Sequence, residues 1–148
     1  EDGVPAVIIH GSLHSFHWNL GKDKFKFEGE AWLKLLGIVS GNHGPKAPIT
    51  VKTVKSDHPI MRGIPAEWRI PKGELYNSNQ VLPSATPLAI GSTGTARQPD
   101  EQVCVWINKC GKANVFGISL GHYNETMKDD DNFGDLLVRG MLWSCGKL

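Results

Sequence analysis

The sequence predicts a single α/β domain with a mostly parallel sheet that ends in a C-terminal hairpin. Residues 4–9 form an unbroken apolar run, residues 102–120 are rich in β-forming residues around one tight turn, and residues 132–145 place apolar side chains at helical spacing. At 148 residues, the chain is long enough for one compact domain, residues 1–148, and we do not expect a second.

The apolar run at residues 4–9 does not alternate with polar residues, which is typical of a strand covered on both faces in a parallel sheet. The run ends at His10-Gly11-Ser12. An interior parallel strand needs a neighbour on each side. A chain that opens on such a strand is therefore expected to lack the strand-helix units that would precede it.

The first half of the chain continues with a predicted helix and a predicted strand. Residues 27–36 contain good helix formers and are followed by Gly37, at which we expect the helix to end. Residues 48–54 alternate between apolar and polar side chains, which predicts a half-exposed strand. Residues 56–72 hold three prolines and one glycine, so we expect them to form mostly loop.

The second half is expected to be β-rich and to close with a helix. Strands are predicted at residues 74–76, 87–90 and 102–108. Because Gly111 can adopt a positive φ, residues 109–112 predict a tight turn, from which residues 113–120 return as the second strand of a hairpin. The apolar residues of the closing helix are Phe133, Leu136, Leu137, Met141 and Leu142, and Asp130, Asp131 or Asn132 caps its start.

The charge balance argues against nucleic acid as a partner, and the distribution of apolar residues argues against a membrane. Sixteen Lys and Arg residues against 15 Asp and Glu residues give a formal net charge of +1, and no basic stripe stands out. No run of 18 apolar residues is present, and the N-terminus lacks the pattern of a signal peptide, although a signal removed earlier would leave no trace. We therefore expect a soluble protein of the cytoplasm or the periplasm.

The cysteine pattern does not indicate a zinc site or a redox motif. Cys104, Cys110 and Cys145 include no Cys-x-x-Cys spacing. Free cysteines are usually interior, so we expect buried thiols, with one disulfide plus one free thiol as the alternative.

Several short motifs occur in a characteristic order along the chain. Residues 7–11 form a strand that ends in a histidine and a glycine. Residues 106–112 join a tryptophan strand to a glycine turn, residues 115–122 form a strand that closes on Gly-His, and the last helix ends in Trp143. Together with Gly73-Glu74-Leu75-Tyr76, this order resembles the trehalose-utilisation (ThuA-like) family over residues 4–145. The family's Asp-Glu-Leu-Tyr motif has glycine in place of aspartate here.

The resemblance implies a flavodoxin-like, three-layer sandwich, similar to that of class I glutamine amidotransferases, without the family's first strand-helix units. In the amidotransferases, a nucleophilic cysteine lies on a sharp turn after a strand. The corresponding turn here is His10-Gly11-Ser12, which has no cysteine. We therefore do not expect cysteine-dependent amide hydrolysis.

Histidines gather just beyond the first predicted strand, where ligands of open α/β sheets usually bind. His10, His14, His17 and the adjacent Trp18 are candidates for ligand contact. If this segment is helical, His10 and His14 lie one turn apart and can bind a divalent metal or act as acid and base. A polar loop is the alternative, and no other cofactor is evident.

His122 follows a glycine after a predicted buried strand. If that strand neighbours the first one, His122 and His10 line a shared cleft; otherwise His122 supports the next loop. Asn124 and Glu125, which come shortly after it, are further candidates for ligand binding. His43 lies between glycines in a predicted loop, where it contacts a ligand or serves as a turn residue.

Glu74 and Tyr76 are two residues apart in a predicted strand, so they are expected to share one face. A carboxylate that accepts hydrogen bonds from hydroxyls and an aromatic ring that covers a pyranose suit sugar recognition. Glu74 is also the candidate general acid or base. The alternative is that Tyr76 packs as a lid on the core.

Three functions are open at this point. The resemblance implies carbohydrate utilisation, and we expect an enzyme or enzyme partner acting on trehalose or a related disaccharide or keto-sugar, with His10, Glu74 and His122 as catalytic residues. The alternatives are a non-catalytic sugar-binding or scaffold module and a metal-dependent hydrolase that uses the histidines of residues 10–17. We expect a small-molecule sugar as partner, and pairing of two copies through an exposed sheet edge.

Overall fold

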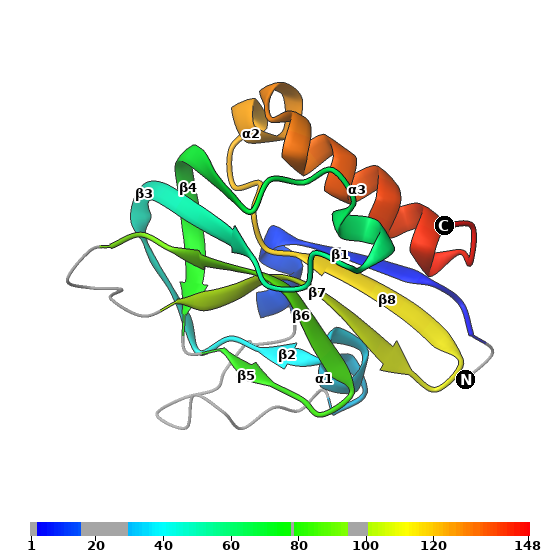
Figure 1. Ribbon diagram of the computed structural model, residues 1–148. Coiled ribbons are helices and arrows are strands. Elements are labelled where there is room, and N and C mark those ends of the chain that lie inside the picture. The colour runs from blue at the N-terminus through cyan, green and yellow to red at the C-terminus, as the bar shows by residue number, and fades with distance from the viewer. Residues whose placement is uncertain (1–2, 16–29, 78, 95–100) are drawn as a thin grey trace.

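A six-stranded sheet forms the centre of the computed structural model, which describes residues 3–15, 30–77, 79–94 and 101–148 (Figure 1). In spatial order, its strands are β1 (Ala6–Ile9), β8 (Ala113–Ile118), β7 (Gln102–Cys110), β6 (Ala85–Ser92), β3 (Asn42–Thr53) and β4 (Glu67–Asn77). A separate two-stranded ribbon joins β2 (Ile38–Val39) to β5 (Gln80–Val81). Strands β1 and β4 are therefore the two edges of the main sheet.

The sheet is mixed and mostly antiparallel, so the prediction of a mostly parallel sheet is wrong. Strand β1 runs parallel to β8, with Ala6 opposite Val115 and Ile9 opposite Ile118, whereas the other neighbouring pairs of the main sheet are antiparallel. A parallel neighbour requires a crossover connection, usually a helix, but an antiparallel neighbour can follow a short hairpin. Between residues 38 and 118, the described part of the chain contains no α-helix to make such crossovers.

Helices lie on both faces of the sheet, as an α/β domain requires (Figure 1). One face is covered by α3 (Asp131–Ser144), with α2 (Asn124–Asp129) and a 3₁₀ helix (Pro59–Met61) beside it. The other face carries α1 (Glu30–Leu36) and a 3₁₀ helix (His10–His14). Alternate residues of β1 belong to the two cores, so this strand is covered on both faces, as its apolar run predicts.

Irregular pairing between β3 and β4 accompanies a bend that carries one edge of the sheet toward the other. Their register shifts between His43 and Lys46 and again between Ala47 and Ile49. Such bulges bend a strand and increase its twist. As a result, Glu74 on β4 lies 3.6 Å from His10, which follows β1, although four strands separate β1 from β4 in the sheet order.

Strand β4 begins at Glu67, so the predicted loop at residues 56–72 is too long. Trp68 and Ile70 are buried and alternate with exposed neighbours, which is the periodicity of a strand. Pro71 is accommodated because β4 is an edge strand and its pairing with β3 is interrupted there. Strand β3 likewise begins earlier than predicted, at Asn42, so His43 lies in a strand rather than in a loop.

Helix α1 ends at the predicted glycine. Gly37 has a φ of +72° and donates its N–H to the carbonyl of Leu33 at 2.9 Å. The buried amide of Asn108 donates to the last carbonyls of the helix, those of Lys34 at 2.8 Å and Leu35 at 2.9 Å. Residues 27–29, which are also predicted to be helical, lie outside the described residues.

The predicted hairpin is formed by β7 and β8. Cys110 pairs with Ala113 across the turn, in which Gly111 has a φ of +58°. The predicted strand at residues 87–90 is part of β6. Strand β8 ends at Ile118, two residues earlier than predicted.

Helix α3 closes the chain as predicted, but its buried face differs from the predicted one. The side chain of Asp130 caps the helix by accepting from the N–H of Phe133 at 2.8 Å. The buried residues are Phe133, Leu136, Gly140 and Ser144, whereas Met141 and Leu142 are exposed. Gly140 allows this rotation, because the ring of Phe116 occupies the space that a side chain there would need. Helix α2 falls in a polar stretch for which no helix is predicted.

The three cysteines are free thiols, so the disulfide alternative is wrong. Cys104 is buried in β7, Cys110 is half-buried and Cys145 is exposed, so burial is confirmed for Cys104 alone. None of the helices in the described ranges has the length and apolar composition needed to span a membrane.

Candidate functional site

His10 lies at the turn where β1 becomes a 3₁₀ helix. Its φ of +41° is unusual for a residue with a side chain. The Nδ1 atom of His10 lies 2.7 Å from the carbonyl oxygen of Ser119, which follows β8. Because a carbonyl can only accept a hydrogen bond, Nδ1 carries a proton, and in the neutral ring Nε2 presents its lone pair on the other side.

His122 reaches the same place from β8. Since β1 and β8 are parallel neighbours, the segments that follow them leave the sheet at the same edge. Gly121 has a φ of +99°, and a side chain there would meet the ring of Phe133 at 2.8 Å. The resulting turn places Nδ1 of His122 3.0 Å from Nε2 of His10, so the predicted convergence of the two histidines is confirmed.

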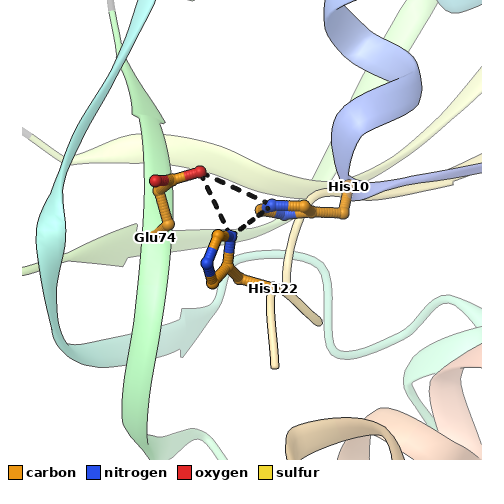
Figure 2. A group of neighbouring side chains, drawn as sticks. All are labelled: His10, Glu74 and His122. Atoms are coloured by element: carbon orange, nitrogen blue, oxygen red, sulfur yellow. Dashed lines mark hydrogen bonds and ion pairs between the residues drawn. The ribbon is translucent and has the colours of Figure 1, made fainter. Parts of the chain in front are cut away.

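Glu74 completes the group from the opposite edge of the sheet (Figure 2). Its Oε2 atom lies 3.2 Å from Nδ1 of His122 and 3.6 Å from Nε2 of His10. The side chains of His10, Glu74 and His122 are 16%, 11% and 23% exposed, so the three lie near the surface in a largely buried setting. We call these three residues the His-Glu cluster.

The glycine before Glu74 does not remove a group from the His-Glu cluster. A side chain at Gly73 would meet Cδ1 of Ile49 at 2.5 Å, on the face of the sheet opposite to Glu74. An aspartate at this position would therefore point into the apolar layer. The departure from the family motif at residue 73 is explained by this packing.

Burial controls the protonation of His10. Removal from water lowers the pKa of His10 below its usual value of 6.5; the hydrogen bond to Ser119 opposes this effect, the neighbouring His122 adds to it and the charge of Glu74 opposes it. The ring is therefore neutral at pH 7. The lone pairs of His10 Nε2 and of the Glu74 carboxylate both face Nδ1 of His122. The His-Glu cluster can therefore exchange a proton with a ligand or hold one cation.

Tyr76 packs beside the His-Glu cluster, on the same face of β4 as Glu74, as predicted. Its ring makes edge contacts with His10 at 5.1 Å, His14 at 4.7 Å and His43 at 6.3 Å between ring centroids. Burial, assisted by the charge of Glu74, raises the pKa of Tyr76 to about 12. Only 4% of Tyr76 is exposed, which favours the packing alternative; its contact with a ligand stays a prediction.

His43 contacts the outer oxygen of Glu74. Its Nδ1 atom lies 3.3 Å from Oε1 of Glu74 and 3.2 Å from the carbonyl oxygen of Gly44. Both neighbours are acceptors, so Nδ1 of His43 carries the proton. His43 is 53% exposed and also lines a small cavity with Asn42 and Asn77.

A larger cavity of about 480 Å³ adjoins the His-Glu cluster between β4 and α2. Its lining residues are Arg69, Pro71, Lys72, Tyr123, Glu125, Thr126, Asp129 and Asp130. The ring of Tyr123 contacts that of His122 at 4.6 Å, and Nζ of Lys72 lies 4.1 Å from the centre of the Tyr123 ring. Glu125 is thus a predicted residue that borders a cavity, whereas Asn124 is exposed at the start of α2 and is not among the lining residues.

Sequence reasoning missed Tyr123, Lys72 and Ser119. Tyr123 directly follows His122 and was within reach of the same argument, but Lys72 falls in the segment predicted to be loop. The role of Ser119 depends on its backbone carbonyl, which no residue pattern reveals.

The predicted metal pair of His10 and His14 is not the group that converges. Among the described residues, the group able to share one ion is His10, Glu74 and His122. His14 instead lies against Tyr76, because a 3₁₀ helix has three residues per turn and does not align positions four apart. His17 and Trp18 lie outside the described residues, so their ligand contacts stay predictions.

The sequence profile of the ThuA family, which is described as trehalose utilisation, matches residues 1–144. The chain belongs to the ThuA family. None of the curated proteins compared with it matches.

Solved ThuA-like proteins share the fold. A ThuA-like protein from Parabacteroides merdae superimposes with a TM-score of 0.74 at 20% identity, over 99% of this chain and 62% of that one. A ThuA-like protein from Bacteroides uniformis superimposes with a TM-score of 0.70 at 20% identity, over 96% of this chain and 58% of that one. A cytoplasmic protein from Salmonella typhimurium superimposes with a TM-score of 0.65 at 14% identity, over 96% of this chain and 55% of that one. The chain thus spans about three fifths of the length of these proteins.

Proposed function

We propose that this ThuA-family chain is a sugar-processing enzyme for trehalose or a related disaccharide or keto-sugar, with the His-Glu cluster as its reaction centre. The observation that carries the proposal is the convergence of His10, Glu74 and His122 within 3.0–3.6 Å from three separate parts of the chain. Groups of titratable side chains in a partly buried setting are characteristic of catalytic sites.

The residues of the His-Glu cluster suit reactions at sugar hydroxyl or carbonyl groups. A neutral imidazole and a carboxylate can both accept a proton from a hydroxyl or from carbon beside a carbonyl. The bond from His10 to Ser119 fixes which nitrogen of His10 faces the ligand. Because the three groups are already positioned by the backbone, little rearrangement is required before reaction.

The adjoining cavity supports the choice of a sugar-sized ligand. Its volume of about 480 Å³ falls in the range of small-molecule sites, and it is bordered by the ring of Tyr123 and the carboxylate of Glu125. An aromatic ring beside hydrogen-bonding groups is the usual environment of a pyranose. The family description of trehalose utilisation points to the same ligand class.

Sugar binding is tested by thermal unfolding with trehalose, glucose and keto-sugars at increasing concentration. A ligand present at 100 times its dissociation constant stabilises the folded protein by about 2.7 kcal/mol, which raises the midpoint by several degrees. We expect such a shift with at least one of these sugars. A chain that unfolds cooperatively without a shift in any of them contradicts the proposal.

Catalysis is tested by following conversion of the bound sugar by NMR. Replacing Glu74 by Gln keeps the size of the side chain and removes its charge, so we expect turnover to fall by at least about 100-fold, a typical contribution of acid-base catalysis. The matched control is Glu67→Gln, which changes an exposed carboxylate at the start of the same strand, outside the His-Glu cluster and the cavity. If the wild-type chain and both variants bind the sugar equally well and none converts it, the chain is instead a non-catalytic sugar-binding module.

A further inference from the structure

We propose that His10, Glu74 and His122 bind one divalent transition-metal ion through Nε2 of His10, Oε2 of Glu74 and Nδ1 of His122. The inference names a cofactor for the reaction centre and rests on the proposed function only for the role of the ion. Its binding depends on the geometry of the three ligand atoms alone.

The separations of the three ligand atoms match those around a metal ion. They are 3.0 Å between the two histidines, 3.2 Å from His122 to Glu74 and 3.6 Å from His10 to Glu74. A tetrahedral ion with bonds of about 2.0–2.1 Å separates its ligand atoms by roughly 3.3 Å. The observed values therefore surround the expected one, and a small movement of each side chain would complete the coordination.

The protons of the His-Glu cluster leave lone pairs that face one another. The N–H of His10 is directed at Ser119, so its Nε2 atom can only accept. Glu74 is also an acceptor, and without an ion one proton on Nδ1 of His122 serves both of them. With an ion bound, the ring of His122 would take its other tautomer, with the proton on Nε2, so that Nδ1 would offer a lone pair to the ion. Two acceptors 3.6 Å apart that share one donor are stabilised by a cation between them.

The ligands already have the outer partners that orient metal-binding side chains. A metal-binding histidine usually donates its other ring N–H to a carbonyl or carboxylate, as His10 does to Ser119 at 2.7 Å. A metal-binding carboxylate is usually hydrogen-bonded in turn, and Nδ1 of His43 lies 3.3 Å from the free Oε1 of Glu74. Both contacts would persist with an ion bound.

The donor set indicates the class of metal and a reactive type of site. Two imidazoles and one carboxylate suit zinc or iron, whereas calcium and magnesium prefer oxygen ligands. Three protein ligands leave at least one position open, as in catalytic rather than structural metal sites. The ion would supply Lewis-acid polarisation to a sugar hydroxyl or carbonyl oxygen at that position.

The test is a calorimetric titration of tag-free, metal-stripped full chain with Zn²⁺ at pH 7.5, without sugar. We expect one Zn²⁺ per chain with a dissociation constant below about 10 µM. Glu74→Gln replaces the charged carboxylate ligand by a neutral amide, and His122→Ala removes a ligand atom. For each we expect affinity to fall by more than the roughly 10- to 100-fold that loss of an outer partner costs. His58→Asn, a histidine outside the His-Glu cluster, should leave affinity unchanged.

Binding weaker than about 10 µM, or binding that both ligand variants retain, would overturn the proposal. Circular dichroism and cooperative unfolding establish that each variant is folded, and the nearly isosteric Glu74→Gln decides the outcome if His122→Ala does not fold. The metal and sugar proposals fail separately. Sugar conversion by the metal-stripped chain would leave the proposed function standing alone, whereas Zn²⁺ binding without any sugar effect would leave only the metal site.

Discussion

His10 has the one positive φ found among the non-glycine residues in the described ranges. This conformation costs about 1–2 kcal/mol for a residue with a side chain, although histidine adopts it more often than most. The pairing of β1 with β8 and the bond to Ser119 fix the residue on both sides. Strained backbone conformations cluster at active sites, so the φ of His10 supports the proposal that the His-Glu cluster is a reaction centre.

The three thiols are expected to react at very different rates. Cys145 is exposed, whereas burial raises the pKa of Cys104 well above the ordinary range and its Sγ contacts the carbonyl of Ala89. In a titration with a thiol-reactive dye, we expect Cys145 to be labelled first and Cys104 only after unfolding. Peptide mapping identifies the order, and rapid labelling of Cys104 in the folded protein would contradict the packing of β7.

His58 is expected to make stability fall below neutral pH. Burial lowers the pKa of His58 from 6.5, although the charge of Asp57 opposes the effect, and its Nδ1 accepts from the N–H of Ile60 at 3.3 Å. The unfolded chain therefore binds more protons between the folded pKa and 6.5. The stability that the neutral ring contributes is fully present above pH 6.5 and is lost as the pH falls through the folded pKa.

His58→Asn is the matched variant for this effect, because Asn also caps a helix start but does not titrate. The measurement is the free energy of unfolding in urea at pH 7.5 and pH 5. We expect the wild-type chain to lose more stability between these values than the variant. Equal losses would show that His58 is not buried as described.

At the scale of elements, two glycines of α3 make opposite predictions. A methyl group at Gly140 would meet the ring of Phe116 at 2.2 Å, whereas nothing lies within 4 Å of one at Gly134. We expect Gly140→Ala to destabilise the protein by about 1–3 kcal/mol through overpacking. Gly134→Ala should stabilise it by about 0.5–1 kcal/mol through helix propensity. Urea unfolding of both variants tests the pair, and equal effects would contradict the contact of α3 with β8.

Local signals predicted most elements, because each depends on residues close in sequence. Gly37 and Gly111 mark the end of α1 and the turn of the hairpin, and the alternation at residues 48–54 marks β3. The direction of the sheet could not be read in this way. It depends on which strands pair. The one strand with the pattern of a parallel sheet, β1, forms the single parallel pair of the described main sheet, with β8.

The candidate site was predictable in part for the same reason. His10 and His122 follow strands that neighbour each other, so their meeting needed only that pairing. The contact of Glu74 with both histidines depends on the bend in β3 and β4, which brings the two edges of the sheet together. Bulges at residues 43–49 carry no strong local signal in the sequence. Glu74 could therefore be selected as a candidate for its chemistry, but its contact with the two histidines could not be predicted.

At the scale of the whole molecule, the main sheet has two edge strands, β1 and β4. In the described part of the chain, β1 is hydrogen-bonded to β8 on one side only. An unpaired edge can add a strand from another copy, so association of two chains stays a prediction. Sedimentation over a range of concentrations tests it, with a dimer as the expected result and a monomer at all concentrations as the contradictory one.

The central claim is that the bent sheet brings His10 and Glu74 into contact, and a double-mutant cycle in unfolding free energy tests it most directly. The variants are His10→Ala, Glu74→Gln and the double replacement, with His58→Asn and Glu74→Gln as the control pair. Residues in contact show a coupling of about 0.5–3 kcal/mol, whereas distant ones add within about 0.3–0.5 kcal/mol. We predict coupling in the contact range for His10 with Glu74 and additivity for the control; additive effects in the first pair would contradict the account.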